Sequence, residues 1–106
     1  MKQEVVMEVN EPFRIDVHHH IVPPDYVLAL ESVGIHDALG RSFPSWSPNE
    51  AISFLDKFSI ATAVVSISSP GVYLYKADFS SEQNRCEFAR DLGRRSNEYA
   101  AWLRSE

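Results

Sequence analysis

The chain has little of what marks a secreted or membrane-embedded protein. Its 106 residues include a single cysteine, Cys86, so no internal disulfide can form and the side chain is expected to fill space within a helix. No apolar run approaches the ~20 residues that a membrane span requires. The first residues mix lysine, glutamate and valine and lack the apolar core of a signal peptide. These features predict a cytoplasmic protein with no membrane partner.

Clustered positive charge is also missing. The net charge is −5 and the basic residues are scattered, Arg94 and Arg95 being the only adjacent pair. Binding to a phosphate backbone depends on grouped lysine and arginine, so the sequence argues against nucleic acid as a partner. The length allows one small domain at most.

One stretch carries the strongest chemical signal: residues 13–24, Phe-Arg-Ile-Asp-Val-His-His-His-Ile-Val-Pro-Pro. It predicts a strand that must stop at the two prolines, which cannot donate to a sheet ladder. Side chains alternate along a strand, so Asp16, His18 and His20 are expected on one face and His19 on the other. Two imidazoles one strand repeat apart can bind the same cation, and the tips of parallel strands are where α/β folds keep their sites.

Spacing alone leaves other interpretations open. The three histidines could form an incidental tract that binds nickel or copper loosely, or a turn of exposed imidazoles without a ligand. Two histidines do not complete a tetrahedral zinc site. Asp16 could orient a ligand imidazole from behind, or be a polar group satisfied in the interior of the fold.

Helix signals follow the histidine stretch. Residues 25–31 predict a short helix with Gly34 as its left-handed cap, and residues 35–46 predict a loop. Ser47 and Glu50 have capping-box spacing around Pro48, so a helix is expected from there to about residue 57 or 58.

The second half predicts one strand and one long helix. Residues 61–67 form a β-branched apolar run, typical of a strand covered on both faces, and residues 68–71 end it with turn residues. Ser80 and Gln83 suggest a further capping box. The apolar stripe expected in the following helix is Cys86, Ala89, Leu92, Tyr99, Ala100 and Leu103. The unit from the first strand to the second should be a right-handed parallel β-α-β crossover, which places the chain in the α/β class.

The histidine pattern Asp16-x-His18-x-His20-x-x-Pro23 resembles the first strand of the amidohydrolase superfamily, specifically the amidohydrolase-related branch that includes aminocarboxymuconate-semialdehyde decarboxylase and 6-methylsalicylate decarboxylase. The resemblance runs from Arg14 onward through nearly the whole chain. Its further segments are residues 46–48, 60–72, 89–90 and 97–99.

The resemblance implies a metal-dependent (β/α)₈ TIM barrel. Such a barrel takes about 250 residues, so residues 13–106 would supply the first two β-α units of an incomplete barrel. Residues 1–12 would be a polar lead-in, with residues 5–7 as a candidate edge strand. In the family, the histidines matching His18 and His20 ligate one divalent metal, usually zinc, and the remaining ligands and the catalytic histidine come from later strands.

Two loop residues gain a candidate role from the same resemblance. Arg41 and Trp46 would help to hold an acidic substrate, although their spacing differs from the family pattern by about one residue. Surface charge and loop anchoring are the alternatives. Residues 69–71 would line the pocket or simply form a turn, and His36 is expected to be a solvent-exposed histidine.

Three hypotheses for function follow. The first is part of a zinc- or manganese-dependent non-oxidative decarboxylase of a small aromatic or conjugated carboxylic acid. The second is a metal-dependent hydrolase of the same superfamily, using a metal-bound water of pKa about 7. The third is a non-enzymatic remnant that binds metal weakly or self-associates, for example as a homo-oligomer, through an open strand edge.

Overall fold

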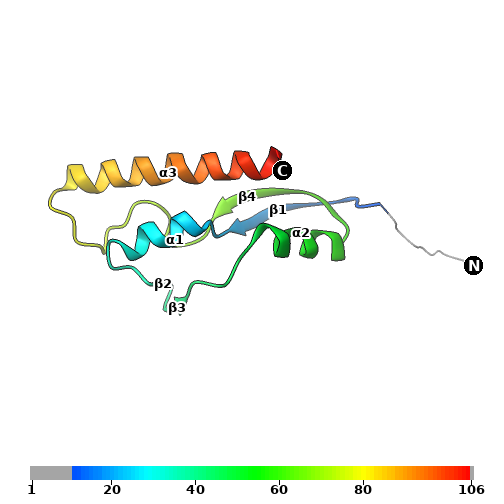
Figure 1. Ribbon diagram of the computed structural model, residues 1–106, viewed down its shortest axis with the longest axis horizontal. Coiled ribbons are helices and arrows are strands. Elements are labelled where there is room, and N and C mark those ends of the chain that lie inside the picture. Colours follow the sequence, from blue (N-terminus) through cyan, green and yellow to red (C-terminus); the bar gives the residue numbers. More distant parts are fainter. Residues whose placement is uncertain (1–10, 106) are drawn as a thin grey trace, which may run out of the picture.

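A computed structural model describes residues 11–105 of the chain (Figure 1). Its elements in order are β1 (Arg14–Ile21), α1 (Pro24–Glu31), β2 (Asp37–Ala38), β3 (Arg41–Ser42), α2 (Pro48–Lys57), β4 (Ile60–Ile67) and α3 (Glu82–Ser105). The edge strand expected at residues 5–7 lies outside the described residues. Every longer element predicted from the sequence is present, within one or two residues of its expected ends.

The two long strands, β1 and β4, pair in parallel and are joined through α2, as predicted. Because the strands run the same way, their carboxyl ends lie at the same end of the sheet. The pairing brings His20 opposite Ser66. The register is irregular between Arg14 and Ile15 and again between Asp16 and His19.

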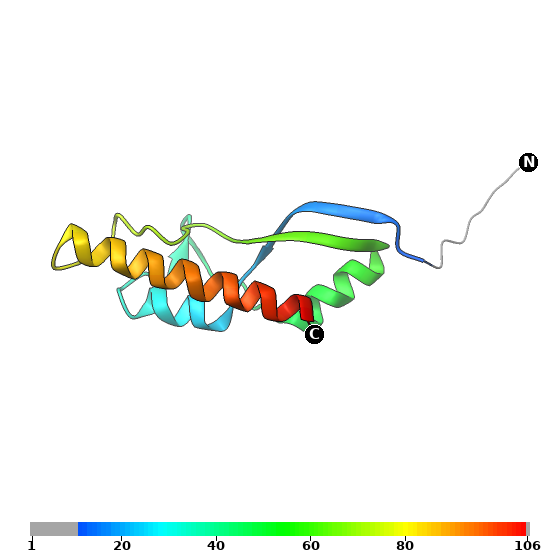
Figure 2. The ribbon, with the colours of Figure 1, turned by 90° about the horizontal axis from the view of Figure 1, so that it is seen from above.

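The helices lie on one side of this two-stranded sheet (Figure 2). Both α2 and α3 contact β4, and burial alternates accordingly along the strands. Ala63, Val65 and Ile67 on the covered face of β4 are half-buried, whereas Thr62, Val64 and Ser66 are exposed. The expectation that this strand is covered on both faces is therefore wrong for the part of the chain that the structure describes. No element within residues 11–105 covers the second face, which is called the bare face below.

The hydrophobic core lies beyond the strand ends, between α1, the loop after β4 and α3. Its buried members are Tyr26, Ala29, Leu30, Leu74, Ala77 and Leu92. Tyr26 is 1% exposed, and its hydroxyl donates to the carbonyl of Gly71 at 2.7 Å. That bond ties α1 to the loop that leaves β4, at the end of the sheet where both strands finish.

Local capping signals predicted the helix starts well. The Ser47 hydroxyl accepts from the Glu50 amide at 3.1 Å, with Pro48 as the first residue of α2. At α3 the cap is shifted by one residue, because Ser81 rather than Ser80 accepts from the Asn84 amide at 3.0 Å. Adjacent serines give the same sequence signal, and only the path of the chain decides between them.

The segment expected to be a plain loop contains a small antiparallel hairpin formed by β2 and β3. Its two turn residues, Leu39 and Gly40, have φ angles of 53° and 79°. Hairpin turns of this kind favour asparagine or aspartate before the glycine, so a leucine there gave no recognisable turn signal. Leu39 is 88% exposed at the hairpin tip.

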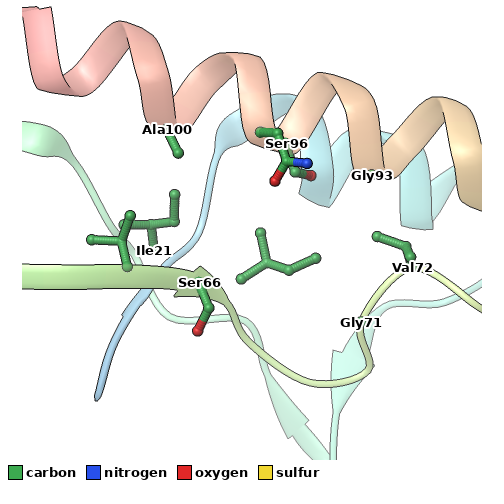
Figure 3. A pocket seen from close by; sticks show the side chains of 10 residues that line it. Ile21, Ser66, Gly71, Val72, Gly93, Ser96 and Ala100 are labelled. Atoms are coloured by element: carbon green, nitrogen blue, oxygen red, sulfur yellow. The ribbon is translucent and has the colours of Figure 1, made fainter. Parts of the chain in front are cut away.

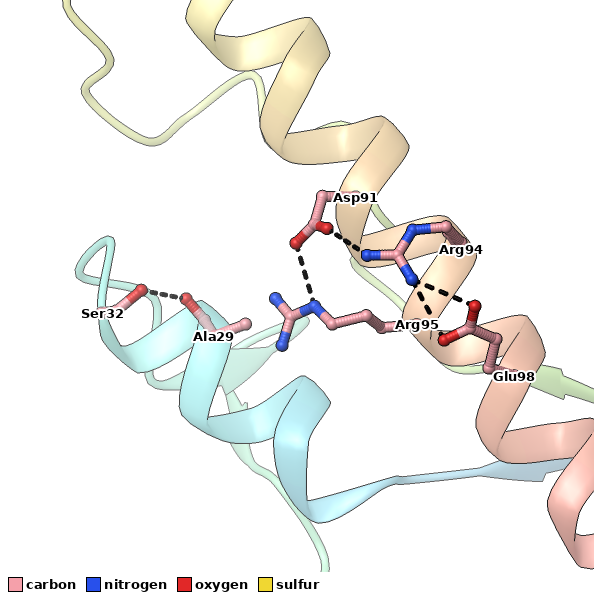
Figure 4. Close-up of polar contacts among 6 residues, drawn as sticks. All are labelled: Ala29, Ser32, Asp91, Arg94, Arg95 and Glu98. Atoms are coloured by element: carbon pink, nitrogen blue, oxygen red, sulfur yellow. Dashed lines mark hydrogen bonds and ion pairs between the residues drawn. The ribbon is translucent and has the colours of Figure 1, made fainter.

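The long helix α3 buries one stripe and keeps the other side ionic. Leu92 and Ser96 are its buried residues, and the rest of the predicted stripe is half-buried. On the exposed side, Asp91 and Glu98 bracket Arg94, and Asp91 also pairs with Arg95 (Figure 4). Solvent screens exposed pairs at this spacing, so they support the helix weakly and do not determine the fold. No helix within residues 11–105 is both long and apolar enough to cross a membrane.

The Tyr26 bond gives a test of how the strand ends are held. Replacing Tyr26 with phenylalanine should lower the free energy of unfolding by about 1–3 kcal/mol, because the carbonyl of Gly71 loses its partner. The matched control is Tyr75→Phe, at a tyrosine that is 71% exposed, where we expect no change. Urea unfolding of both variants measures the difference, and equal losses would contradict the assignment.

The same tyrosine should make stability depend on alkaline pH. Burial raises the pKa of Tyr26 from 10.0 to about 12. The Tyr26 hydroxyl therefore ionises at a lower pH in the unfolded chain than in the folded chain. The contribution of the neutral Tyr26 side chain to stability is complete below about pH 10 and is lost as the pH rises towards 12. This decline should be smaller in Tyr26→Phe, where only the tyrosines with a lesser rise in pKa, Tyr73 and Tyr99, remain. Urea unfolding of both proteins at increasing alkaline pH measures the difference.

Candidate functional site

His18 and His20 lie together on the bare face of the sheet. Their ring centroids are 4.7 Å apart and the rings meet edge to face. Both residues are exposed, as are Ile15 and Val17 before them. The pair therefore opens onto a largely apolar sheet surface that no described helix covers.

His20 is also held from the neighbouring strand. Its Nδ1 lies 3.2 Å from the hydroxyl of Ser66, the residue opposite it in the ladder. When Nδ1 is the hydrogen-bonded nitrogen, Nε2 is left to face a ligand, as in histidines that bind metals. Ser66 was missed by sequence reasoning, because only the register of the two strands brings it to His20.

Asp16 and His19 lie on the other, helix-covered face. The Asp16 carboxylate accepts from the backbone amide of His18 at 3.1 Å and pairs with Nδ1 of His19 at 2.9 Å. The hydrogen bond from the His18 amide lowers the pKa of the Asp16 carboxyl most, and the bond with the His19 ring lowers it further. The His19 ring packs 6.1 Å from that of Phe54 in α2. His19 thus packs behind the strand as expected, but the prediction that Asp16 shares a face with His18 and His20 is wrong.

The donors fit half of a metal shell. Two imidazoles at this separation match the paired-histidine part of a zinc site, which takes four ligands. Within residues 11–105 there is no group of three or more histidine, cysteine, aspartate or glutamate side chains that could hold a metal ion.

The other candidate residues lie elsewhere. Arg41 is exposed on β3 of the hairpin. The Trp46 ring packs 6.2 Å from that of Tyr99 in α3, the contact expected of a loop anchor. His36 is exposed, as predicted. None of the described contacts joins Arg41, Trp46 or His36 to the histidine pair.

Two hollows flank the strand ends. One, of about 460 Å³, lies between the hairpin and the loop after β4 and includes His36, Ser69, Pro70 and Tyr73. The other, of about 380 Å³, lies between the end of β4 and the small residues Gly93, Ser96 and Ala100 of α3 (Figure 3). The segment of residues 69–71 contributes to both, in line with the pocket-lining alternative.

Arg85 of α3 binds the later part of the loop that follows β4. Arg85 donates to the carbonyls of Leu74 and Ala77, the latter at 3.0 Å, and pairs with Glu82 at 3.1 Å. Its guanidinium also lies 5.1 Å from the centre of the Phe79 ring. A planar group with five donors suits this combination of carbonyls and ring face.

Curated proteins similar to this chain are named as decarboxylases. Decarboxylase yanB of Aspergillus niger and decarboxylase macB of Penicillium terrestre are each 36% identical over 93 residues, 88% of this chain. The 6-methylsalicylic acid decarboxylase acuB of Aspergillus aculeatus is 30% identical over 91 residues, 86% of the chain. The match covers 23%, 25% and 25% of these relatives, so the chain spans about a quarter of their length. No family model matches the chain.

A solved structure agrees with the sequence relatives. The crystal structure of a protein named amidohydrolase II matches 74% of this chain and 25% of its own, with a TM-score of 0.53 and 30% identity. The chain resembles the N-terminal portion of an amidohydrolase-related decarboxylase. This confirms the predicted resemblance and the predicted α/β fold class, as a partial barrel: the described residues contain one parallel strand pair and no closed barrel.

The anchoring role of Arg85 can be tested by hydrogen exchange. In Arg85→Ala the amides of residues 74–79 should exchange about tenfold faster or more, because hydrogen bonds from a charged group contribute about 1.5–3 kcal/mol. Arg90→Ala, at an exposed position of the same helix, should leave these amides unchanged. Equal protection in both variants would show that the loop is held without Arg85.

Proposed function

We propose that His18 and His20 are paired ligands of one divalent cation, zinc or alternatively manganese, in a decarboxylase that acts on a small aromatic or conjugated carboxylic acid. The observation that carries the proposal is the contact of the two rings, 4.7 Å apart on an open sheet face. The names of the similar fungal proteins support the reaction class.

In this proposal the chain's own residues orient the cation and the acid. His20 presents Nε2 because Ser66 engages Nδ1. Arg41 would pair with the carboxylate and Trp46 would stack on the acid. Both roles need the 35–46 segment to approach the histidines. The Trp46 ring already packs on Tyr99, so the support for a substrate-binding role is weaker for Trp46 than for Arg41. The cation itself would supply charge stabilisation for the bound acid.

Hydrolysis is the second candidate, and the likeness to a solved structure named amidohydrolase II favours it. The same two histidines would then hold a cation that lowers the pKa of a bound water to about 7. Product analysis with carboxylic acid and amide or ester substrates separates the two reactions, because only decarboxylation releases carbon dioxide.

Zinc titration of single alanine variants tests the ligand pair. His18→Ala and His20→Ala should each weaken zinc binding about 10-fold or more, whereas His19→Ala should cost less because its ring faces α2. His36→Ala is the matched control at an exposed histidine. Equal losses at positions 18, 19 and 20 in isothermal titration calorimetry would indicate an unspecific histidine tract.

We expect the 106-residue chain by itself to bind the cation without turning over an acid. Two imidazoles leave a zinc shell incomplete, and general acid–base assistance, worth about 10²–10⁴-fold in rate, needs a further positioned group. The assay measures carbon dioxide release from 6-methylsalicylate and related acids with added zinc or manganese. Turnover that disappears in His18→Ala would refute this expectation.

A further inference from the structure

Between Asp16 and His19, the strand that bears the histidines contains one extra residue relative to β4, and a separate register shift lies before Ile15. Asp16 pairs with Ala63 and His19 with Val65, so three steps along β1 match two steps along β4. Such a β-bulge leaves one residue outside the ladder and redirects the side chains that follow. The neighbours Val17 and His18 are accordingly both exposed, although strict alternation would place them on opposite faces.

The bulge determines which face carries the histidine pair. Asp16 points to the helix-covered side, so an unbroken strand would send His18 and His20 to that same side. With one extra residue, the side chains beyond it exchange faces. The observed result is that His19 joins Asp16 beside α2, while His18 and His20 meet on the bare face.

The Asp16 carboxylate spans the extra residue. One oxygen, Oδ1, accepts from the His18 amide at 3.1 Å, and the other, Oδ2, pairs with the His19 ring at 2.9 Å. Bonds from an aspartate to the amide two residues on stabilise a local turn of the backbone. The pair is sheltered, with the side chains of Asp16 and His19 only 23% and 14% exposed.

We propose that Asp16 is a positioning residue for the cation site: its carboxylate holds the bulge that turns His18 and His20 to the open face, without touching the cation. The inference rests on the proposed metal function. It assigns to Asp16 a task that acts through the backbone amide of His18, not through a ligand ring.

The test uses cobalt(II) as a spectroscopic probe of the 106-residue chain. Asp16→Ala should weaken Co²⁺ binding, followed by visible absorption, about 10–100-fold. Asp16→Asn keeps an oxygen that can accept from the His18 amide, so it should restore most of the affinity. Asp78→Ala, at an exposed aspartate, is the matched control and should bind like the parent chain.

A second measurement needs no metal. The contact between the His18 and His20 rings should give nuclear Overhauser effects in the metal-free chain, which persist in Asp16→Asn and vanish in Asp16→Ala. If the alanine variant does not fold, the asparagine variant decides: loss of its ring contact would overturn the proposal.

The remaining outcomes separate the positioning role of Asp16 from the proposed metal function. Parent-like Co²⁺ affinity and ring contacts in Asp16→Ala would overturn the positioning role alone. An asparagine variant that keeps the ring contact but binds as weakly as alanine would also overturn it, because the carboxylate charge would then act on the cation directly. A parent chain that binds no Co²⁺ would refute the proposed function, while the ring contacts still test the bulge.

Discussion

Parallel pairing of β1 with β4 determines how the remaining elements are arranged. Two parallel strands cannot be joined by a tight turn, so the chain must cross over through a helix. Here α2 makes that crossing, and α3 follows on the same side of the sheet. The covered side takes the half-buried residues of β4, and the opposite side is left for His18, His20 and Ser66. Because the helices pack on one face of the sheet, the candidate cation site lies on the opposite face.

Local signals predicted most of this fold because they act over a few residues. The prolines after β1, the Ser47 cap and the β-branched run of β4 each determine their element without reference to distant parts of the chain. The cap of α3 and the β2–β3 hairpin were misassigned for the same reason. Neighbouring serines and a leucine in a left-handed turn carry too little local information to decide.

The site was predictable only in part. The spacing of His18 and His20 indicated a shared face, and the structure agrees. The side of Asp16 depends on a register irregularity, which arises from pairing with a strand more than 40 residues away. The bond between Ser66 and His20 is likewise a consequence of register. Long-range pairing thus determines which polar groups support the histidines. The periodicity of a single strand does not predict these contacts.

The two histidines are held by different means, and both act before any ligand arrives. His20 is oriented across the ladder by a side chain, whereas the position of His18 follows from its own backbone amide bonded to Asp16. Ordering a flexible side chain on binding costs about 0.5–1.5 kcal/mol. In the folded chain the two rings are already 4.7 Å apart, so part of this loss of side-chain entropy occurs during folding and not on binding. A pair arranged in this way gains affinity from preorganisation, and that gain is lost if either supporting contact is removed.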